Sequence, residues 1–460
     1  MSARHPSDEA LQTALQKAPQ KADPAVELAV SLGRSIQSDI YRPGISGQRP
    51  VVPVDHTALE AAAEALMSPE AFAYIAGGAG AERTMAANRA AFDRWQTWPR
   101  PLRNVSQRDL SIDLFGRRAT PLLLAPIGVA EMAHPDADLA VARAAASVGM
   151  PVTLSNQASF PMEEVAAAAP TGNRFFQLYW SASDALNASL LQRAEASGCE
   201  AIVITLDTHL LGWRTRDLDL AYLPFTRGLG IAQYTSDPVF AELVRERVAL
   251  AASGAIPVSP PPKLTPQTVR AGISIAQKGG RLTGTGVRSS LRSPIPRAAV
   301  ETFLEVFSTP ALTWDDLAKA RQWTTLPIIL KGVVHPDDAD HAVDLGLDGV
   351  WVSNHGGRQI DQSVPTLAAL PSVVERVGGR VPIVFDSGVR GGADALIALA
   401  LGATAVGIGR PVAYGLGIAG EAGVRAVLRH ILAELDISLG LAGAVSIAEL
   451  GPHLLRDANR

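Results

Sequence analysis

The sequence predicts an α/β fold, a (β/α)8 barrel with an N-terminal helical extension and a long insertion after the fourth strand. The main observation is a set of eight short apolar runs that end in polar or glycine-rich clusters and are separated by Ala-rich amphipathic segments. Such alternation is typical of parallel strands covered by helices. The runs span residues 121–128, 151–156, 174–180, 201–207, 327–333, 349–355, 382–388 and 404–410.

The positions of the ionisable side chains also support a barrel. The clusters at the ends of the later runs contain Lys331, His355, Arg358, Asp386 and Arg410. In a (β/α)8 barrel the carboxyl ends of all the strands meet at one face, and that face carries the active site. A barrel with insertions reaches 460 residues as one domain, so the length does not require a second one.

The segment before the first strand is predicted as an arm followed by helices. Residues 1–53 are polar and contain many turn formers, so we assign them to an N-terminal arm and residues 54–460 to the barrel domain. Residues 55–75 are predicted as two helices, the second beginning near Ser68 and ending at the glycines from Gly77 onward. At the other end of the chain, residues 437–460 are predicted as two helices that close the barrel.

Residues 235–312 are predicted as a basic loop inserted after the fourth strand. From Arg247 to Val300 there is no Asp or Glu, whereas basic residues, Pro, Ser and Gly are frequent. A long loop in a compact domain is usually functional or disordered. The alternatives are a mobile solvated excursion, a lid over the active site, or a basic surface for an acidic partner or an anionic membrane. Regular alternation resumes at Thr313, where a new helix opens.

The composition excludes several classes of protein. A net charge of −4 and no long basic stripe before the barrel give little support to a nucleic-acid-binding role. The single cysteine, Cys199, excludes an internal disulfide and favours a reducing, cytoplasmic location. The amino terminus lacks the apolar core of a secretory signal, and no apolar stretch is long enough for a membrane span. No set of residues suggests a metal site.

Glycines and arginines after the last two strands predict a phosphate-binding site. Gly388, Gly391 and Gly392 follow the seventh run, and Gly407 and Gly409 end the eighth. Barrels commonly hold a phosphate at this place through backbone amides, to which glycine allows close approach. The side chains of Arg390 and Arg410 would add charge-assisted hydrogen bonds.

Lys331, His355 and Arg358 predict redox or acid–base chemistry on an anionic substrate. A lysine at the end of the fifth strand can stabilise negative charge on an electron-accepting ring, or simply extend to solvent. His355 and Arg358 lie three residues apart in a glycine-containing turn. A histidine is the usual base near neutral pH, and the planar arginine fork suits a carboxylate. Alone, His355 could equally be structural.

The third and fourth strands contribute further polar groups to the same rim. Asp207 is expected to orient His355 and to raise its pKa, although a carboxylate here could also cap a helix. Arg214 follows within the same loop and adds a second guanidinium. Gln177 and Tyr179 alternate along the third strand, so both side chains can reach the mouth of the barrel.

Taken together, these residues resemble the FMN-dependent L-2-hydroxy acid oxidases and dehydrogenases, and most of all their lactate 2-monooxygenase branch. The resemblance runs from about Tyr41 to the C-terminus, interrupted by the insertion. It depends on these strings: Phe72-Ala-Tyr-Ile-Ala-Gly-Gly-Ala, Ala125-Pro-Ile-Gly, Phe176-Gln-Leu-Tyr, Thr205-Leu-Asp-Thr, Gly212-Trp-Arg, Leu330-Lys-Gly, Ser353-Asn-His-Gly-Gly-Arg-Gln, Asp386-Ser-Gly-Val-Arg and Gly409-Arg-Pro.

The resemblance implies FMN as cofactor and a role for each matched residue. His355 would be the base and Asp207 its partner, Arg214 and Arg358 would clamp the substrate carboxylate, and the phenols of Tyr74 and Tyr179 would contact the substrate. Tyr74 lies before the barrel and enters only through the resemblance. The residues expected to contact the flavin are Pro126, Ile127, Gly128, Ser155, Gln177, Thr205, Lys331, Ser353, Asp386, Ser387, Gly388, Arg390, Gly409 and Arg410.

The expected reaction is oxidation of a small L-2-hydroxy acid, lactate first, to the 2-keto acid, with oxygen reoxidising the flavin and possible coupled oxidative decarboxylation. Hydride transfer and a carbanion route would use the same residues. The alternatives within the family are a non-oxygen acceptor or a larger acid such as mandelate. The resemblance also implies a homo-oligomer, a tetramer or octamer. Gln157 departs from the family pattern, because a bulky apolar or aromatic residue often borders the substrate there.

Two alternatives lie outside the family. Another phosphate-binding barrel, such as an isomerase or a nucleotide dehydrogenase, would need no histidine and arginine pair. A non-catalytic scaffold could use the basic insertion to bind an acidic partner or a membrane. The presence of Asp207, His355 and both arginines argues against a scaffold, because surface binding places no demand on them.

Overall fold

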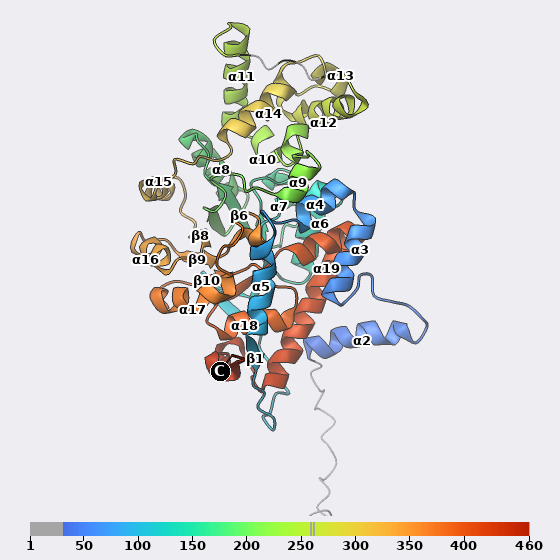
Figure 1. Ribbon diagram of the computed structural model, residues 1–460, viewed down its shortest axis with the longest axis vertical. Helices are drawn as coiled ribbons and strands as arrows, with labels where there is room; N and C mark the ends of the chain where they lie inside the picture. The colour runs from blue at the N-terminus through green and yellow to red at the C-terminus, as the bar shows by residue number, and fades with distance from the viewer. Residues whose placement is uncertain (1–30, 258–259, 261–262, 460) are drawn as a thin grey trace, which may run out of the picture.

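The computed structural model describes residues 31–257, 260 and 263–459, and eight of its strands close into a parallel barrel (Figure 1). All eight predicted strands are confirmed, and each hydrogen-bonds in parallel with its neighbours in chain order, so the fold is a (β/α)8, or TIM, barrel. The strands are β4 (Leu122–Leu124), β5 (Val152–Leu154), β6 (Arg174–Tyr179), β7 (Ala201–Thr205), β8 (Ile328–Val333), β9 (Gly349–Val352), β10 (Ile383–Phe385) and β11 (Ala405–Ile408).

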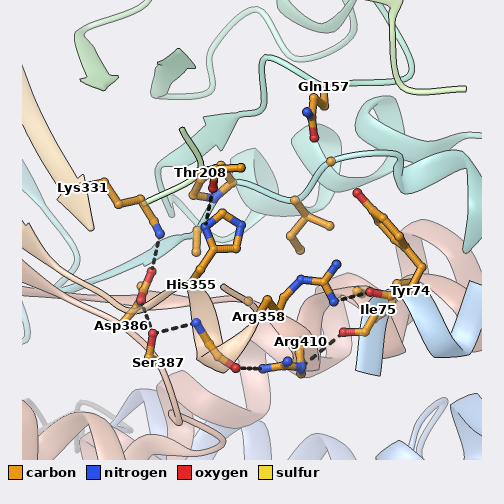
Figure 2. A pocket seen from close by; sticks show the side chains of 18 of the residues that line it. Tyr74, Ile75, Gln157, Thr208, Lys331, His355, Arg358, Asp386, Ser387 and Arg410 are labelled. Carbon is orange, nitrogen blue, oxygen red and sulfur yellow. Dashed lines mark hydrogen bonds and ion pairs between the residues drawn. The ribbon is translucent and has the colours of Figure 1, made fainter. Parts of the chain in front are cut away.

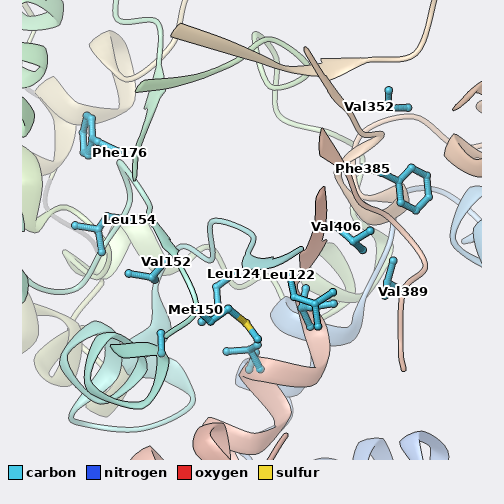
Figure 3. Close-up of a cluster of buried hydrophobic side chains, with 14 of the residues drawn as sticks. Leu122, Leu124, Met150, Val152, Leu154, Phe176, Val352, Phe385, Val389 and Val406 are labelled. Atoms are coloured by element: carbon cyan, nitrogen blue, oxygen red, sulfur yellow. The ribbon is translucent and has the colours of Figure 1, made fainter. Parts of the chain in front are cut away.

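Helices cover the outside of the barrel between successive strands. They pack on outward-facing apolar side chains of the strands, such as Leu122, Leu124 and Phe176 (Figure 3). The capping box at Thr313 starts α15 as the sequence predicts. The covering helices are α6 (Ala137–Ser147), α7 (Met162–Ala168), α8 (Asp184–Ala196), α15 (Trp314–Lys319), α16 (Pro336–Asp344), α17 (Thr366–Val377), α18 (Gly392–Ala400) and α19 (Arg410–Ala442).

Side chains fill the interior of the barrel and close its amino-terminal end. Phe175, Val203 and Trp351 belong to a separate buried cluster drawn from the inward faces of the strands. The hairpin of β2 (Ile112–Leu114) and β3 (Arg117–Ala119) plugs this end, and the rings of Phe115 and Phe175 meet edge to face at 6.1 Å. The opposite, carboxyl-terminal end therefore remains for a ligand.

The predicted helical extension is confirmed. Asp55 caps α3 (His56–Leu66) by accepting the amide of Ala58 at 2.8 Å. Ser68 caps α4 (Pro69–Ala76), which stops at Gly77, and α5 (Arg83–Asp93) leads to β1 (Trp95–Thr97). Of the predicted arm, residues 1–30 lie outside the described residues. The rest includes α2 (Leu32–Gly44), which packs on α19 through a hydrogen bond from the Gly33 amide to Asp436 at 2.8 Å.

The insertion after β7 is helical, so the prediction of a loop is wrong. Its helices stand beyond one side of the barrel, at the top of Figure 1. A buried aromatic cluster holds them together, since Phe303 of α14 contacts Phe225 at 5.2 Å and Tyr234 at 4.8 Å between ring centroids. The elements are α9 (Thr215–Asp219), η2 (Pro224–Arg227), α10 (Ala232–Thr235), α11 (Pro238–Ala252), α12 (Pro266–Thr283), α13 (Val287–Ser290) and α14 (Ile295–Val306).

The positive charge of the insertion is partly compensated, since four of the eight basic residues from Arg247 to Val300 form ion pairs. Acidic residues that lie outside the window from Arg247 to Val300 pair with the basic residues inside it. The ion pairs are Arg247 with Glu301 and Glu305, Lys278 with Glu131, Arg281 with Glu164, and Arg297 with Glu301. Two of them, at Lys278 and Arg281, tie α12 to the barrel, because Glu131 follows β4 and Glu164 lies in α7. A surface for acidic partners therefore stays a prediction, with part of its charge already paired within the chain.

The tail differs from the two predicted helices. Helix α19 continues through Ile437 to Ala442 and ends at Gly443, whose φ of 86° lies in the left-handed region. Beyond it, β12 (Leu455–Asp457) pairs antiparallel with β1, which connects the end of the chain to the segment before the barrel. Within the described ranges, no helix has the length and apolar character needed to cross a bilayer.

Candidate active site

A cavity opens at the carboxyl ends of the barrel strands (Figure 2). It is lined by the loops after β4, β5, β7, β9, β10 and β11, by α4, and by Phe225 of the insertion. In Figure 2, Lys331 and Tyr74 lie on opposite sides of His355 and Arg358, and Gln157 lies above them. Side chains far apart in the sequence therefore meet around one space, as the position of the predicted site in a barrel requires.

His355 and Asp207 form a partly buried pair at the edge of this cavity. The imidazole Nδ1 lies 2.8 Å from the Asp207 carboxylate and 3.3 Å from the hydroxyl of Thr208. This contact occupies Nδ1 and leaves Nε2 for a ligand in the cavity. Strand β8 bulges at Gly332, where a Cβ would lie 3.0 Å from Asp207, so glycine allows the close approach of strand and carboxylate.

The turn that carries His355 is held in an unusual conformation. His355, Gly356 and Gly357 all have positive φ, and the value for His355 is 57°. Left-handed backbone costs a non-glycine residue roughly 1–2 kcal/mol, so surrounding contacts must impose it. Ser387 accepts the amide of Gly356 at 2.9 Å, and Asn354 accepts that of Gly357 at 3.1 Å. The turn is thereby fixed with the imidazole at the cavity.

The net pKa shift of His355 is opposite to the predicted one. Burial lowers the pKa of His355 below its usual value, and the nearby positive charges of Lys331 and Arg214 act in the same direction. The Asp207 carboxylate raises it, as expected, but does not outweigh burial. The imidazole is therefore neutral at neutral pH, which is the state that a general base needs.

We expect the pH dependence of substrate oxidation to follow from this shift. Because the folded pKa is lowered, His355 stays neutral until the pH falls below the ordinary histidine value of about 6.5. In the FMN-loaded protein, kcat/KM for anaerobic flavin reduction should fall as the pH drops below about 6.5. Asp207→Asn should shift this acid-side decrease to still lower pH and should also slow the reaction. An acid limb above 6.5 in the unmodified protein would contradict this assignment.

Two guanidinium groups face the same cavity beside the ring of Tyr74. The Cζ atoms of Arg358 and Arg214 lie 4.9 Å and 6.0 Å from the centroid of that ring. Arg358 also donates to the carbonyls of Tyr74 and Gly77. Burial and the charge of Arg214 lower the pKa of Arg358, and the more distant charge of Asp217 raises it without reversing the shift. Among the described residues Arg358 forms no ion pair, so it has no direct anionic partner. A carboxylate between the two guanidiniums would supply that partner.

The predicted phenol contacts also reach the site. Tyr74 and Tyr179 both line the cavity, and both are 7% exposed. Burial raises the pKa of Tyr179, so its hydroxyl remains protonated and can donate a hydrogen bond to an anionic ligand. Tyr74 belongs to α4, which explains why it can serve the site although it precedes the barrel in sequence.

Unpaired polar atoms beneath the cavity fit the ring of a flavin. The side-chain amide nitrogen of Gln177 and the hydroxyl of Thr205 are buried without a hydrogen-bond partner within the described part of the chain. Such groups are costly unless a ligand or water satisfies them. Lys331 lies alongside, donating to Ser353 at 2.8 Å and approaching Asp386 at 3.3 Å. These donors and acceptors suit the carbonyl and imide edge of an isoalloxazine.

The other end of the cavity fits a phosphate. Burial lowers the pKa of Arg390 and of Arg410, the latter to about 10 with a further contribution from the charge of Arg390, so a dianion placed there would relieve both. Gly388 and Gly409 line this end, and Gly388 has a φ of 100°. Glycine is required at position 407 for packing rather than for phosphate binding, since a Cβ there would lie 2.7 Å from the Trp351 ring.

The amide of Gly392 is not free to bind a phosphate as the sequence predicts, and Gly391 lies against the Glu434 carboxylate. The Gly392 amide donates to Glu434 at 2.6 Å, and a Cβ on Gly392 would lie 2.2 Å from the backbone nitrogen of Leu435. These two glycines allow α18 to pack closely against α19. Phosphate binding is thus left to Gly388, Gly409 and the two arginines.

Most of the predicted site residues line the cavity, and the others lie directly beneath it. Asp207, Gln177, Thr205, Ser353 and Ser155 belong to the second group. The residues at the cavity wall are Tyr74, Pro126, Ile127, Gly128, Tyr179, Arg214, Lys331, His355, Arg358, Asp386, Ser387, Gly388, Arg390, Gly409 and Arg410.

Sequence reasoning missed several contributors. Thr208, Leu211 and Phe225 also line the cavity, and Gln359 contacts Arg214. Phe225 comes from the insertion, where its ring packs against those of Phe303 at 5.2 Å and Phe307 at 6.4 Å between centroids. No local pattern reveals such a long-range contact. Gln359 directly follows Arg358 in a matched string, and that position was the available signal.

Comparison with known proteins agrees with this geometry. The model of the family described as FMN-dependent dehydrogenase matches residues 63–457. The chain belongs to this family. It is 39% identical to an FMN-dependent alpha-hydroxy acid dehydrogenase of Penicillium citrinum, over 92% of this chain and 95% of that protein. It is also 39% identical to an L-lactate oxidase of Lysinibacillus sphaericus, over 90% and 95% of the two chains.

The solved structures place the fold in the same family. A crystal structure of mandelate oxidase with (S)-4-hydroxymandelic acid superposes with a TM-score of 0.70 at 34% identity, covering 88% of this chain and 98% of that one. FMN is therefore the cofactor of the family to which the chain belongs, and its relatives oxidise 2-hydroxy acids. The alternative of an unrelated phosphate-binding barrel is wrong.

Proposed function

We propose that this FMN-dependent 2-hydroxy acid oxidoreductase acts on a small L-2-hydroxy acid, lactate first, with oxygen as the electron acceptor. The single observation that carries the proposal is the meeting of a neutral, carboxylate-backed imidazole with two guanidiniums in one cavity. The imidazole can take a proton only from a group held close to it, and the guanidiniums can hold a carboxylate there. A 2-hydroxy acid carries both groups on adjacent carbons.

The chain's own residues would divide the chemistry as follows. Arg214 and Arg358 bind the substrate carboxylate, and the phenols of Tyr74 and Tyr179 donate hydrogen bonds to the substrate. Nε2 of His355 takes the hydroxyl proton, or the α-proton in the carbanion route, and Asp207 stabilises the imidazolium that results. Bound FMN supplies the acceptor for the two electrons that leave the α-carbon as the 2-keto acid forms.

Separate groups would hold the cofactor. Arg390 and Arg410 suit its phosphate, and the polar side chains of Gln177, Thr205 and Lys331 suit its ring. The contacts of Pro126, Ile127, Gly128, Ser155, Ser353, Asp386, Ser387, Gly388 and Gly409 with FMN remain part of this proposal.

We further propose that the oxidation is coupled to decarboxylation, as in the lactate 2-monooxygenase branch. If pyruvate and hydrogen peroxide stay together in the cavity, they react to acetate, carbon dioxide and water, and the sum is lactate plus oxygen to those three products. Support comes from the resemblance at Gly128 and Asp386-Ser-Gly, and from Leu211 and Phe225, which narrow the cavity on the insertion side. If pyruvate leaves first, the products are pyruvate and peroxide.

A second candidate is oxidation of a larger acid such as mandelate. The structural similarity to mandelate oxidase favours it. Gln157 weighs against it, since its side chain is polar, is 6% exposed and lines the cavity above the arginines. An electron acceptor other than oxygen is also compatible with the residues of the site, since none of the contacts above involves the acceptor.

The test is to purify the protein with bound FMN and to mix it anaerobically with lactate, glycolate and mandelate. We expect the flavin absorbance to bleach fastest with lactate. In air, acetate without free peroxide would support the decarboxylating reaction, and pyruvate with stoichiometric peroxide would support an oxidase. Fast bleaching with slow recovery in air would indicate another acceptor. No bleaching by any of the three acids would refute the proposal.

Assembly and location stay proposals. The segment after β7 exposes Leu210, Trp213 and Leu218, of which Trp213 is 72% exposed, next to the site. Exposed apolar residues of this kind are typical of surfaces that another chain covers, which supports the proposed homo-oligomer, a tetramer or octamer. The single, buried Cys199 supports a cytoplasmic location. Light scattering of the purified protein measures the assembly directly.

A further inference from the structure

Gln359 connects the two functional halves of the site. Its amide nitrogen donates to the backbone carbonyls of Asp207 at 2.7 Å and Leu210 at 3.1 Å. Its amide oxygen accepts from Nη2 of Arg214 at 3.0 Å. The side chain is partly buried and uses both donor hydrogens as well as its acceptor. None of these contacts is made with its own loop, because all three partners belong to the segment after β7.

The backbone around Gln359 is packed tightly enough to transmit a displacement. A Cβ on Gly212 would lie 2.5 Å from the carbonyl oxygen of Arg358 and 2.8 Å from Cα of Gln359. Nε of Arg214 donates to the same Arg358 carbonyl at 3.4 Å. The segment from Asp207 to Arg214 therefore wraps around residues 358 and 359, and the glutamine amide fixes both of its ends.

We propose that Gln359 is a positioning residue that sets the distance between the base and the carboxylate clamp. It fixes the base through Asp207, which holds His355, and it fixes the clamp through the guanidinium of Arg214. The inference rests on the proposed function, because it assigns His355 and Arg214 those two roles.

The amide is the group that these contacts require. A carboxylate at this position could accept from Arg214 but could not donate to the two carbonyls, and it would neutralise the clamp. An aliphatic side chain of the same size could neither accept from Arg214 nor donate to the two carbonyls. Both changes would leave buried polar groups without a hydrogen-bond partner. They would disturb the orientation of Asp207 and Arg214 without removing the base or the clamp itself.

The experiment compares Gln359→Leu with the unmodified FMN-loaded protein. Pyruvate binding, followed by the change in flavin absorbance, measures the clamp without needing the base. Anaerobic reduction at saturating lactate measures the base. We expect the Kd of pyruvate to rise about tenfold and the limiting reduction rate to fall about tenfold, consistent with loss of one hydrogen bond to a charged group and two to carbonyls. The acid limb of the pH profile should also move to lower pH as Asp207 loosens.

A double-mutant cycle separates positioning from a general structural effect. In an Arg214→Met background, Gln359→Leu should no longer change the Kd of pyruvate but should still slow reduction. Gln322→Leu, on the exposed η3 turn (Ala320–Gln322) outside the barrel, is the matched control and should change neither. If Gln359→Leu does not retain FMN, Gln359→Met takes its place.

The outcomes are distinct. An unchanged Kd and rate in Gln359→Leu, or an undiminished effect on Kd after Arg214→Met, overturns the inference. The unmodified protein is tested first, so failure of every hydroxy acid to bleach the flavin refutes the proposed function and not the role of Gln359. If lactate bleaches the flavin and Gln359→Leu changes neither the Kd of pyruvate nor the reduction rate, only the positioning role is refuted.

Discussion

Replacing His355 with glutamine should slow anaerobic flavin reduction by lactate by about a hundredfold to ten-thousandfold while leaving FMN bound. This range is what a general base typically contributes. Glutamine keeps a polar side chain of similar length. Among the described residues the hydrogen bonds of His355 go to Thr208, Ser353 and Asp207, and none goes to Gln177, Thr205, Arg390 or Arg410. Stopped-flow absorbance of the flavin, with lactate at saturation, measures the effect.

The control for this substitution is another histidine far from the cavity. His453 is exposed near the C-terminus, so His453→Gln should reduce at the unmodified rate. Because His355 has a left-handed φ, the thermal stability of His355→Gln must be measured as well, to show that the turn has survived. Equal reduction rates in the folded His355 variant and the control would remove His355 from the role of base.

The strands and the rim residues could be predicted from the sequence because the signal there is local and strong. Each strand is buried on both faces, so it appears as an unbroken apolar run. A parallel barrel then brings whatever follows each run to one face. His355, Asp207 and Arg358 are linked by that rule alone, although more than 140 positions separate Asp207 from His355. The family resemblance was needed for Tyr74, which precedes the barrel, and for flavin contacts such as Ser155 and Thr205.

The remaining features depend on contacts that the sequence does not display. The insertion is basic and rich in Pro and Gly, which predicts a loop, but its acidic partners lie elsewhere in the chain and its aromatic residues pack on one another. Asp207 raises the pKa of His355 as predicted, but the net shift is downward, because the sequence shows the carboxylate partner and not the burial that outweighs it. Likewise, Gly391 and Gly392 match a phosphate-binding pattern and instead serve helix packing. The domain boundaries and a lid role for the insertion stay predictions.

Arg358→Met should weaken lactate binding strongly and slow flavin reduction, again with normal FMN content. Its guanidinium is partly buried beside that of Arg214, and both face the cavity where a carboxylate would bind. Removing one partner of a buried charge pair costs about 2–5 kcal/mol, which corresponds to roughly thirtyfold or more in the apparent dissociation constant of lactate. The measurement is the lactate dependence of the anaerobic reduction rate, with pyruvate binding as an independent check.

Arg358→Lys distinguishes charge from shape. Lysine restores the positive charge but not the planar fork, and it cannot reproduce both contacts of the guanidinium with the carbonyls of Tyr74 and Gly77 together with a carboxylate. We therefore expect it to recover part of the affinity and less of the rate, because the rate depends on holding the hydroxyl group beside His355. Loss of FMN from both variants would instead assign Arg358 to the cofactor, and the carboxylate clamp would then rest on Arg214 alone.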